Sequence, residues 1–336
     1  MQENISFSLW CDFIERNFLE NSFVKMIQDG AVNGATSNPS IFQQALMNES
    51  YLEQKESLKK SLDDNKKAIY EALVKMDIQR AAEILLPLYE NNTNDGYISI
   101  EVDPNLCEDA KATIEEGSRL FNDIGYPNVM IKIPATKAGF SAMEELIARG
   151  ISVNATLVFS KDQVVGCMEA FKKGYEKFKQ ISKKEAKDYP RAVVSVFVSR
   201  FDRKCDSILK EHGIPTATLG IKNAQYLYQI LNSYTLPAVR TLFASTGVKG
   251  NELEPAYYIK ELYHPYAINT APLTALNAFV ELENIEEAYL PSLEELEEFF
   301  ASVKEAGVDL NAVSKELLEQ GLEDFKVAFS KILESL

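Results

Sequence analysis

The stretch Val129-Met130-Ile131-Lys132-Ile133-Pro134 places one charged side chain inside an apolar run that ends at a proline. A short run of this kind, rich in β-branched residues, is typical of a buried β-strand. A buried amine is costly unless it becomes neutral or finds partners, and loss of solvent also turns a lysine into a better nucleophile. Lys132 therefore indicates chemistry on a carbonyl group.

Seven other short segments share this character and are separated by helical stretches. Eight alternating strand and helix units predict an α/β fold of the (β/α)₈ TIM-barrel class. The predicted strands cover residues 5–12, 31–38, 96–103, 128–134, 150–159, 191–199, 240–246 and 266–270.

The chain has 336 residues, a length that α/β barrels reach as single units. We expect one barrel domain over residues 1–336. Residues 39–95, after the second strand, are longer than a simple crossover needs and predict a helical insertion. Residues 281–336 predict additional C-terminal helices packed on the barrel.

Composition excludes several classes of partner. A formal charge of −15 disfavours binding to nucleic acid or to an anionic membrane, because the overall field repels phosphate groups. No apolar stretch approaches the roughly 20 residues that span a bilayer. An anionic substrate therefore needs a local basic cluster. The pattern leaves open whether the protein is a monomer or a homodimer.

The four cysteines suggest a reducing compartment. Cys11, Cys107, Cys167 and Cys205 are scattered without metal or redox spacing, so we expect free thiols and a cytoplasmic protein. The chain also lacks a metal-ligand cluster, a phosphate loop and a dinucleotide fingerprint, which predicts that no metal and no cofactor is needed.

Polar side chains recur late in successive predicted strands. In a parallel barrel the strand C-termini converge on one mouth, where active sites lie. Any single one of these residues is better explained as a polar loop position, a helix cap or a salt bridge, and Lys132 alone as a snorkelling lysine. A lysine and two carboxylates together, late in apolar strands, favour a functional ring. Its members are Asp12, Asn38, Glu101, Lys132, Asn154, Thr156, Ser195, Arg200, Ser245 and Lys249.

Several of these residues lie in motifs that together resemble the transaldolase family. The resemblance runs from about residue 9 to residue 274. Its motifs are GATSNPS (34–40), IEVD (100–103), IKIPAT (131–136), GISVNATLVFS (150–160), SVFVSR (195–200) and AINTAP (267–272).

The resemblance implies a function. Transaldolases are (β/α)₈ class I aldolases of the pentose phosphate pathway, in carbohydrate metabolism, and they are transferases. They move a dihydroxyacetone unit from sedoheptulose 7-phosphate to glyceraldehyde 3-phosphate, which gives erythrose 4-phosphate and fructose 6-phosphate. By resemblance, Lys132 forms the Schiff base, Glu101 transfers protons through a water held by Thr156, and Asp12 is the base for carbon–carbon cleavage.

Further roles follow from the same resemblance. Asn38, Asn154 and Ser195 match residues that hold substrate hydroxyls, although Asn38 is also suited to cap a helix. Arg200 matches the phosphate-binding arginine, whose planar fork suits a dianion. Ser245 and Lys249 are further phosphate-binding candidates, with a solvated surface lysine as the alternative for Lys249.

Two competing functions remain open at this stage. The nearer is a fructose 6-phosphate aldolase, a smaller relative that releases free dihydroxyacetone and usually carries glutamine and tyrosine where this chain has Glu101 and Phe197. Phe197 is accordingly a substrate-binding candidate. The other is a noncatalytic sugar-phosphate-binding barrel, since a fold alone does not prove chemistry.

Overall fold

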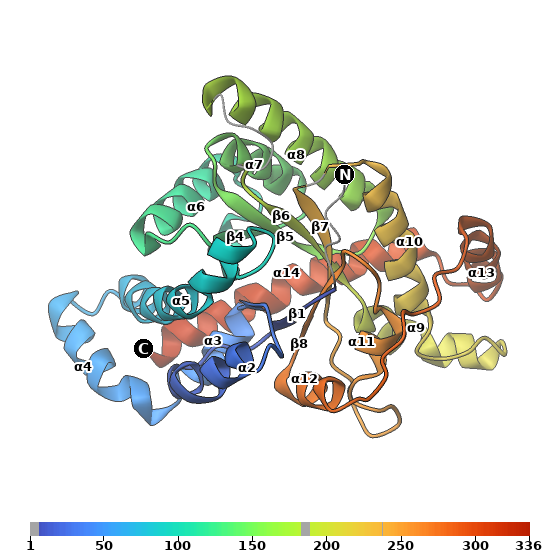
Figure 1. Cartoon of the computed structure of the whole chain (residues 1–336), viewed down its shortest axis with the longest axis horizontal. Helices are drawn as coiled ribbons and strands as arrows, with labels where there is room; N and C mark the ends of the chain where they lie inside the picture. The colour runs from blue at the N-terminus through green and yellow to red at the C-terminus, as the bar shows by residue number, and fades with distance from the viewer. Residues whose placement is uncertain (1–6, 183–188, 237) are drawn as a thin grey trace.

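The computed structural model describes residues 7–182, 189–236 and 238–336, and its centre is a closed barrel of eight parallel strands (Figure 1). Each strand pairs with the next along the chain, and β1 closes the ring against β8. The predicted (β/α)₈ fold is confirmed. The strands are β1 (Ser8–Cys11), β2 (Gly34–Thr36), β3 (Ile98–Glu101), β4 (Val129–Pro134), β5 (Ser152–Val158), β6 (Ala192–Phe197), β7 (Val239–Ala244) and β8 (Ile268–Ala271).

Helices surround this barrel, and the two longest, α5 and α14, have 26 residues each. The helical elements are α1 (Arg16–Phe18), the π-turn η1 (Leu19–Phe23), α2 (Val24–Gln28), α3 (Pro39–Ala45), the 3₁₀ turn η2 (Glu49–Tyr51), α4 (Leu52–Ser61), α5 (Lys66–Asn91), the 3₁₀ turn η3 (Pro104–Leu106), α6 (Ala110–Ile124), α7 (Lys137–Ala148), α8 (Lys161–Ser182), α9 (Ser199–Glu211), α10 (Leu219–Ser233), α11 (Tyr257–Glu261), α12 (Leu273–Val280), α13 (Leu293–Glu305) and α14 (Leu310–Ser335).

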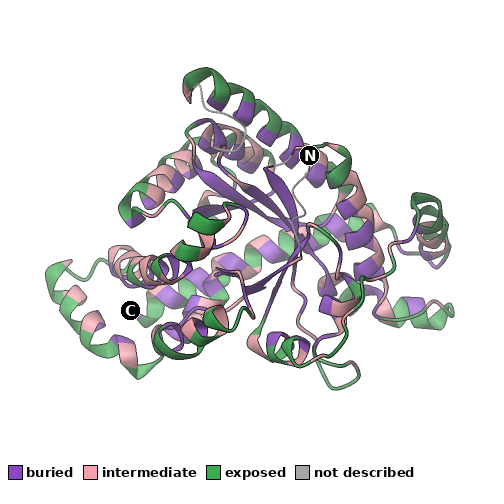
Figure 2. Ribbon diagram, viewed as in Figure 1, coloured by how far each residue is buried: buried purple, intermediate pink, exposed green. Residues whose placement is uncertain are grey.

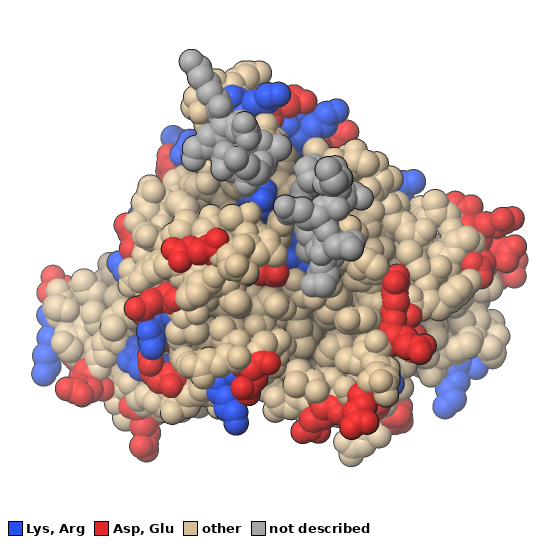
Figure 3. Space-filling model, in the orientation of Figure 1, with Lys and Arg blue, Asp and Glu red and all other residues tan. Residues whose placement is uncertain are grey.

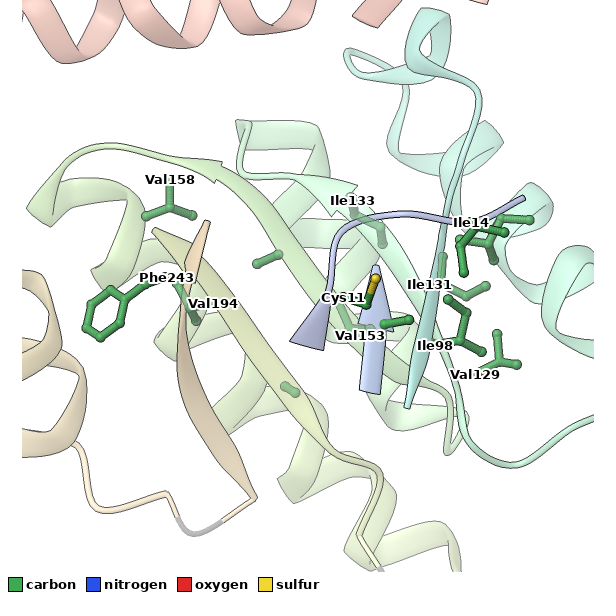
Figure 4. Close-up of a cluster of buried hydrophobic side chains, with 14 of the residues drawn as sticks. Cys11, Ile14, Ile98, Val129, Ile131, Ile133, Val153, Val158, Val194 and Phe243 are labelled. Atoms are coloured by element: carbon green, nitrogen blue, oxygen red, sulfur yellow. The ribbon is translucent and has the colours of Figure 1, made fainter. Parts of the chain in front are cut away.

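Alternate residues of β4 point to opposite sides of the barrel wall. Ile131 belongs to the core between the strands and the surrounding helices, part of which Figure 4 shows. Met130 belongs to a second core inside the barrel, and the strands are the most buried part of the molecule (Figure 2). Because side chains alternate along a strand, Lys132 shares the inward side with Met130. The strand therefore directs the amine into the barrel.

The barrel interior is filled below the mouth by Trp10 on β1, whose side chain is fully buried. Gly34 on β2 makes room for it, because a Cβ at that position would lie 2.7 Å from the indole ring. A glycine is thus required here by close packing, with no special backbone angle involved. Trp10 thus belongs to a packed core inside the barrel.

Helix α14 crosses the barrel where the strands converge (Figure 1) and contacts α3, α5, α9 and β5. Phe329 of α14 packs edge-on against Tyr70 of α5, with ring centroids 5.2 Å apart. The insertion after β2 is helical, as predicted, and comprises α3, η2, α4 and α5. The two additions at residues 39–95 and 281–336 therefore meet each other beside the barrel.

Some predicted boundaries are wrong. Asp12 lies one residue beyond β1, and Asn38 lies two residues beyond β2. The side chain of Asn38 accepts a hydrogen bond from the backbone of Ile41 and caps α3, so the chain has already left the sheet there. Residues 5 and 6 of the first predicted strand lie outside the described residues. Residues 282–292, expected to be helical, precede α13 and form no helix.

The surface agrees with the acidic composition. Acidic side chains gather at the right-hand edge of the face in Figure 3, where α13 lies and contributes Glu294, Glu295, Glu297 and Glu298. Among the described helices, none combines the length and the apolar character that crossing a membrane requires.

Candidate active site at the barrel mouth

Lys132 is buried, with 5% of its surface exposed, and three groups surround its amine. The Nζ atom donates a hydrogen bond to the carbonyl oxygen of Ser37 at 3.0 Å and lies 3.6 Å from Oε2 of Glu101. The ring of Phe325, from α14, has its centroid 5.8 Å away. The amine thus has neighbours from the residue after β2, from β3 and from the C-terminal helix, which favours a functional lysine over a snorkelling one.

Glu101 is the register partner of Lys132 across β3 and β4. Both of its carboxylate oxygens are buried, and neither has a hydrogen-bond partner among the described residues. The pKa of Glu101 is raised to about 7. Burial is the largest cause, Lys132 lowers the pKa, and Asp12 raises it. A carboxyl that titrates near neutrality is suited to give and take protons.

Thr156 and Asn154 lie on β5, two residues apart, so both face the side that carries Lys132, the register partner of Asn154. The Thr156 hydroxyl is buried and, within the described part of the chain, has no hydrogen-bond partner. Both polar atoms of the Asn154 amide have a partner: the nitrogen donates to Ser99 Oγ at 3.0 Å and the oxygen accepts from Ser195 Oγ at 2.7 Å. A shift in the β5–β6 register after Ala155 follows directly, a device common beside active sites.

Asp12 lies just beyond β1 and is anchored by a chain of hydroxyl groups. Thr36 Oγ1 donates to Asp12 Oδ1 at 2.7 Å and lies 2.6 Å from Oγ1 of Thr270 on β8. Burial raises the pKa of Asp12, while Lys132 and the Thr36 hydrogen bond lower it. The two carboxylates therefore have different partners, since Asp12 accepts a hydrogen bond and Glu101 accepts none from the described residues.

A pocket of about 170 Å³ opens at the mouth above these groups. It brings together seven of the predicted site residues, namely Asp12, Asn38, Lys132, Ser195, Phe197, Arg200 and Ser245. Glu101, Asn154 and Thr156 do not line it and lie in the barrel wall beside Lys132. Its remaining lining residues are Thr36, Ser40, Ala244, Thr270 and Phe325.

The far side of the pocket carries a guanidinium group. Arg200 begins the first turn of α9, and its guanidinium carbon lies 5.4 Å from the centroid of the Phe197 ring. Burial lowers the pKa of Arg200, an effect that Asp324 partly offsets. Ser245 follows β7 with a φ of 57°, and its hydroxyl lies 3.1 Å from that of Ser199.

Lys249 is the one predicted site residue with an exposed side chain, and it does not line the pocket. The structure thus places it apart from Arg200, in the loop that follows Ser245. Asp324 and Phe325 were not predicted. Both belong to α14, whose sequence shows an ordinary amphipathic pattern, so no local signal identifies them.

The assembled groups suit reversible addition to a carbonyl. A buried amine stands between two carboxylates in different environments, with amide and hydroxyl groups for a polyol and a guanidinium for an anion. The described residues contain no group of three or more His, Cys, Asp or Glu side chains arranged to hold a metal ion.

The buried Glu101 predicts a pH-dependent cost in stability. Its folded-state pKa of about 7 exceeds the ordinary 4.5, so between these values the folded chain holds a proton that the unfolded chain has lost. Stability from this group is therefore present below about pH 4.5 and lost as the pH rises to about 7. We expect Glu101→Gln to raise the free energy of unfolding at pH 8 by about 2–3 kcal/mol.

Denaturant unfolding of both proteins from pH 4.5 to 8 measures this difference. The gain of the variant should shrink towards pH 4.5, where the carboxyl is neutral in both states. A difference that does not change with pH would mean that the pKa of Glu101 is not raised in the folded protein.

Comparison with known proteins identifies a family and relatives that the chain resembles over nearly its whole length. The family described as Transaldolase/Fructose-6-phosphate aldolase matches the chain over residues 9–336. A protein named Transaldolase from Helicobacter pylori (strain Shi470) is 45% identical over 335 residues, which cover 100% of both chains. Another protein of that name, from Campylobacter jejuni (strain RM1221), is 43% identical over 98% of this chain and 99% of its own.

Proposed function

The chain belongs to the transaldolase/fructose-6-phosphate aldolase family and is a transaldolase, and we propose that Lys132 forms the Schiff base through which the transfer runs. The donor is sedoheptulose 7-phosphate and the acceptor glyceraldehyde 3-phosphate, with erythrose 4-phosphate and fructose 6-phosphate as products. The observation that carries this proposal is the position of the Lys132 amine, buried at the mouth within 3.6 Å of Glu101.

The first step joins the amine to the donor ketone. Lys132 Nζ attacks the carbonyl carbon, and the carbinolamine then loses water to give an iminium ion. Glu101 supplies and removes the protons of these steps through a water molecule held by Thr156. The two buried polar groups, which have no hydrogen-bond partner among the described residues, support this role.

The second step breaks the carbon–carbon bond. Asp12 takes the proton of the donor hydroxyl next to that bond, the aldehyde product leaves, and the bonding electrons pass to the iminium ion to give an enamine. The enamine then attacks the carbonyl carbon of the aldehyde acceptor, and Asp12 returns its proton to the alkoxide that forms. Water hydrolyses the regenerated iminium ion, which releases the ketose product and frees Lys132. The hydrogen bond from Thr36 holds Asp12, which lines the mouth pocket, whereas Glu101 does not line it.

Asn38, Asn154, Ser195 and Phe197 bind the sugar chain. The two hydrogen bonds of the Asn154 amide orient both Asn154 and Ser195, and its nitrogen carries a second hydrogen for a substrate hydroxyl. Arg200 and Ser245 hold the phosphate group at the other end of the pocket, with Lys249 as a more distant positive charge. Glu101 and Phe197 favour transaldolase over fructose 6-phosphate aldolase, whose members usually carry glutamine and tyrosine there.

Location and assembly complete the proposal. All four cysteines are free and buried, which supports a reducing, cytoplasmic environment. We expect a single domain that works as a monomer or homodimer on sugar phosphates, without a cofactor, nucleic acid or membrane.

Reductive trapping tests this function. Borohydride added with fructose 6-phosphate should fix the substrate carbon chain to Lys132, where mass spectrometry of peptides locates it. An adduct on another lysine would refute the proposed site. Without an acceptor, a transaldolase should release little free dihydroxyacetone, whereas steady release would instead indicate the aldolase activity.

Arg200→Ala should weaken the binding of phosphorylated substrates far more than the binding of dihydroxyacetone as donor. Hydrogen bonds to charged groups contribute about 1.5–3 kcal/mol, so we expect a rise of about ten- to hundredfold in KM for fructose 6-phosphate. Lys249→Ala should act in the same direction but less strongly, because its side chain is exposed and its charge is screened. Equal losses with both donors would place the phosphate site elsewhere on the mouth.

A further inference from the structure

The guanidinium of Arg200 is shared between the pocket and the C-terminal helix. Its Nη1 atom donates to Oδ2 of Asp324 on α14 at 3.2 Å. No second acidic side chain within the described residues forms an ion pair with Arg200. The carboxylate of Asp324 thus balances the charge that we assign to phosphate binding.

This carboxylate is fixed in place by its own helix. Gln320 Nε2 donates to Oδ1 of Asp324 at 2.7 Å, which leaves the other oxygen for Arg200. Gly321 lies between them in sequence and permits close approach of α14, since a Cβ there would lie 2.7 Å from Leu157 and 3.3 Å from Arg200 Nη1. Asp324 is therefore set against Arg200 by the packing of α14, and the contact is not that of a freely moving surface side chain.

A groove beside the mouth shows the same opposition of charges. Arg203 and Lys204 of α9 line it together with Arg200. Arg200 lines both the groove and the mouth pocket, whereas Asp324 lines the groove but not the mouth pocket. The acidic residues that line it from α14 are Glu316, Glu319, Glu323 and Asp324.

We propose that Asp324 is a specificity-determining residue, whose carboxylate competes with the phosphate of the substrate for Arg200. The inference rests on the proposed role of Arg200 as the phosphate ligand. Asp324 sets how much binding the phosphate group contributes, and so the margin by which phosphorylated sugars are preferred over unphosphorylated ones.

The balance of charge supports this role. Asp324 is 43% exposed and contacts one nitrogen of Arg200, and a pair of this kind is weak because water screens it. A phosphate dianion binds an arginine through two parallel charge-assisted hydrogen bonds, so it wins the competition. It nevertheless does so beside a second negative charge, and that repulsion is absent for an unphosphorylated ligand.

The test replaces the charge and keeps the shape. Asp324→Asn should lower the inhibition constant of inorganic phosphate and the KM for fructose 6-phosphate by about three- to tenfold, with kcat unchanged. The KM for dihydroxyacetone as donor should stay the same, because it carries no phosphate. Asp324→Glu, which keeps the charge, should resemble the parent protein.

Glu323→Gln is the matched control, since it removes one negative charge from the same groove at a residue that forms no ion pair with Arg200. It should change phosphate inhibition by less than twofold, given the screening of exposed charges. An equal effect of Glu323→Gln and Asp324→Asn would mean that the negative charge of the groove in general weakens phosphate binding, and would overturn the proposal. Weaker phosphate binding by Asp324→Asn would overturn it too, because Asp324 would then position Arg200 for the ligand.

The Arg200→Ala background separates this inference from the proposed function. In the Arg200→Ala background, Asp324→Asn should have no effect on phosphate inhibition, since the guanidinium for which Asp324 competes is absent. If Arg200→Ala itself leaves phosphate inhibition unchanged, the proposed phosphate site fails. If Arg200→Ala weakens phosphate but Asp324→Asn does nothing in the parent protein, only the role of Asp324 fails.

Discussion

Lys132→Ala is expected to abolish the borohydride-trapped adduct and to lower the transfer rate by at least about 10⁴-fold, because among the described residues that line the mouth pocket Lys132 is the only lysine, and it lies beside Glu101. The effect exceeds that of any other single change, since the covalent intermediate itself is lost. The measurement is the initial rate of transfer from fructose 6-phosphate to erythrose 4-phosphate, alongside peptide mass spectrometry.

Two further variants control for the fold. Lys132→Arg keeps a positive charge beside Glu101 but forms no Schiff base, so it should lose activity to the same extent while unfolding at a similar temperature to the parent. Lys161→Ala, an exposed lysine at the start of α8, should keep both adduct and rate. Residual transfer at a tenth of the parent rate in Lys132→Ala would exclude Lys132 as the covalent residue.

Asp12→Asn is expected to allow adduct formation but to block carbon–carbon cleavage, with a loss of about 10²–10⁴-fold in transfer. The amide can still accept the hydrogen bond from Thr36, so the geometry of the mouth is kept while the base is removed. Single-turnover kinetics with fructose 6-phosphate should show a normal burst of trapped protein and almost no glyceraldehyde 3-phosphate.

Glu101→Gln should fail at the earlier stage, with slow formation and slow hydrolysis of the adduct, because the group next to Lys132 no longer transfers protons. Asp103→Asn provides the control, since this nearby carboxylate pairs with Lys67 of α5 and does not line the mouth pocket. If Asp12→Asn and Glu101→Gln stop at the same step, the division of work between the two carboxylates is wrong.

Much of the fold and of the predicted ring could be read from the sequence, for a geometric reason. In a barrel of parallel strands, side chains late in each strand meet at one end, so Lys132 and Glu101 become register neighbours without any long-range information. Strand alternation likewise places Asn154 and Thr156 on one side. Local pattern is sufficient wherever the residue belongs to the barrel wall.

The remaining errors and omissions lie outside that wall. The position of α14 on the barrel depends on contacts with α3, α5 and α9, which an amphipathic pattern does not specify. The sequence therefore carries no signal that Phe325 and Asp324 lie at the site. The exposed side chain of Lys249 follows from the loop after β7, where Ser245 adopts a positive φ. Loop geometry of that kind is not encoded in the spacing of polar residues.

The chain of hydroxyl groups that anchors Asp12 joins residues that are very distant along the polypeptide. Thr36 on β2 and Thr270 on β8 are separated by 234 positions in the sequence. Their hydroxyl groups are in contact because β2 and β8 flank β1. Because closing a long loop is entropically costly, we expect this contact to form after the local helices and the adjacent strand pairs. The Lys132 amine needs only β2, β3 and β4 for its nearest polar neighbours. We therefore expect that, during refolding, the ability to cleave the carbon–carbon bond appears with closure of the barrel, after the lysine has become ordered.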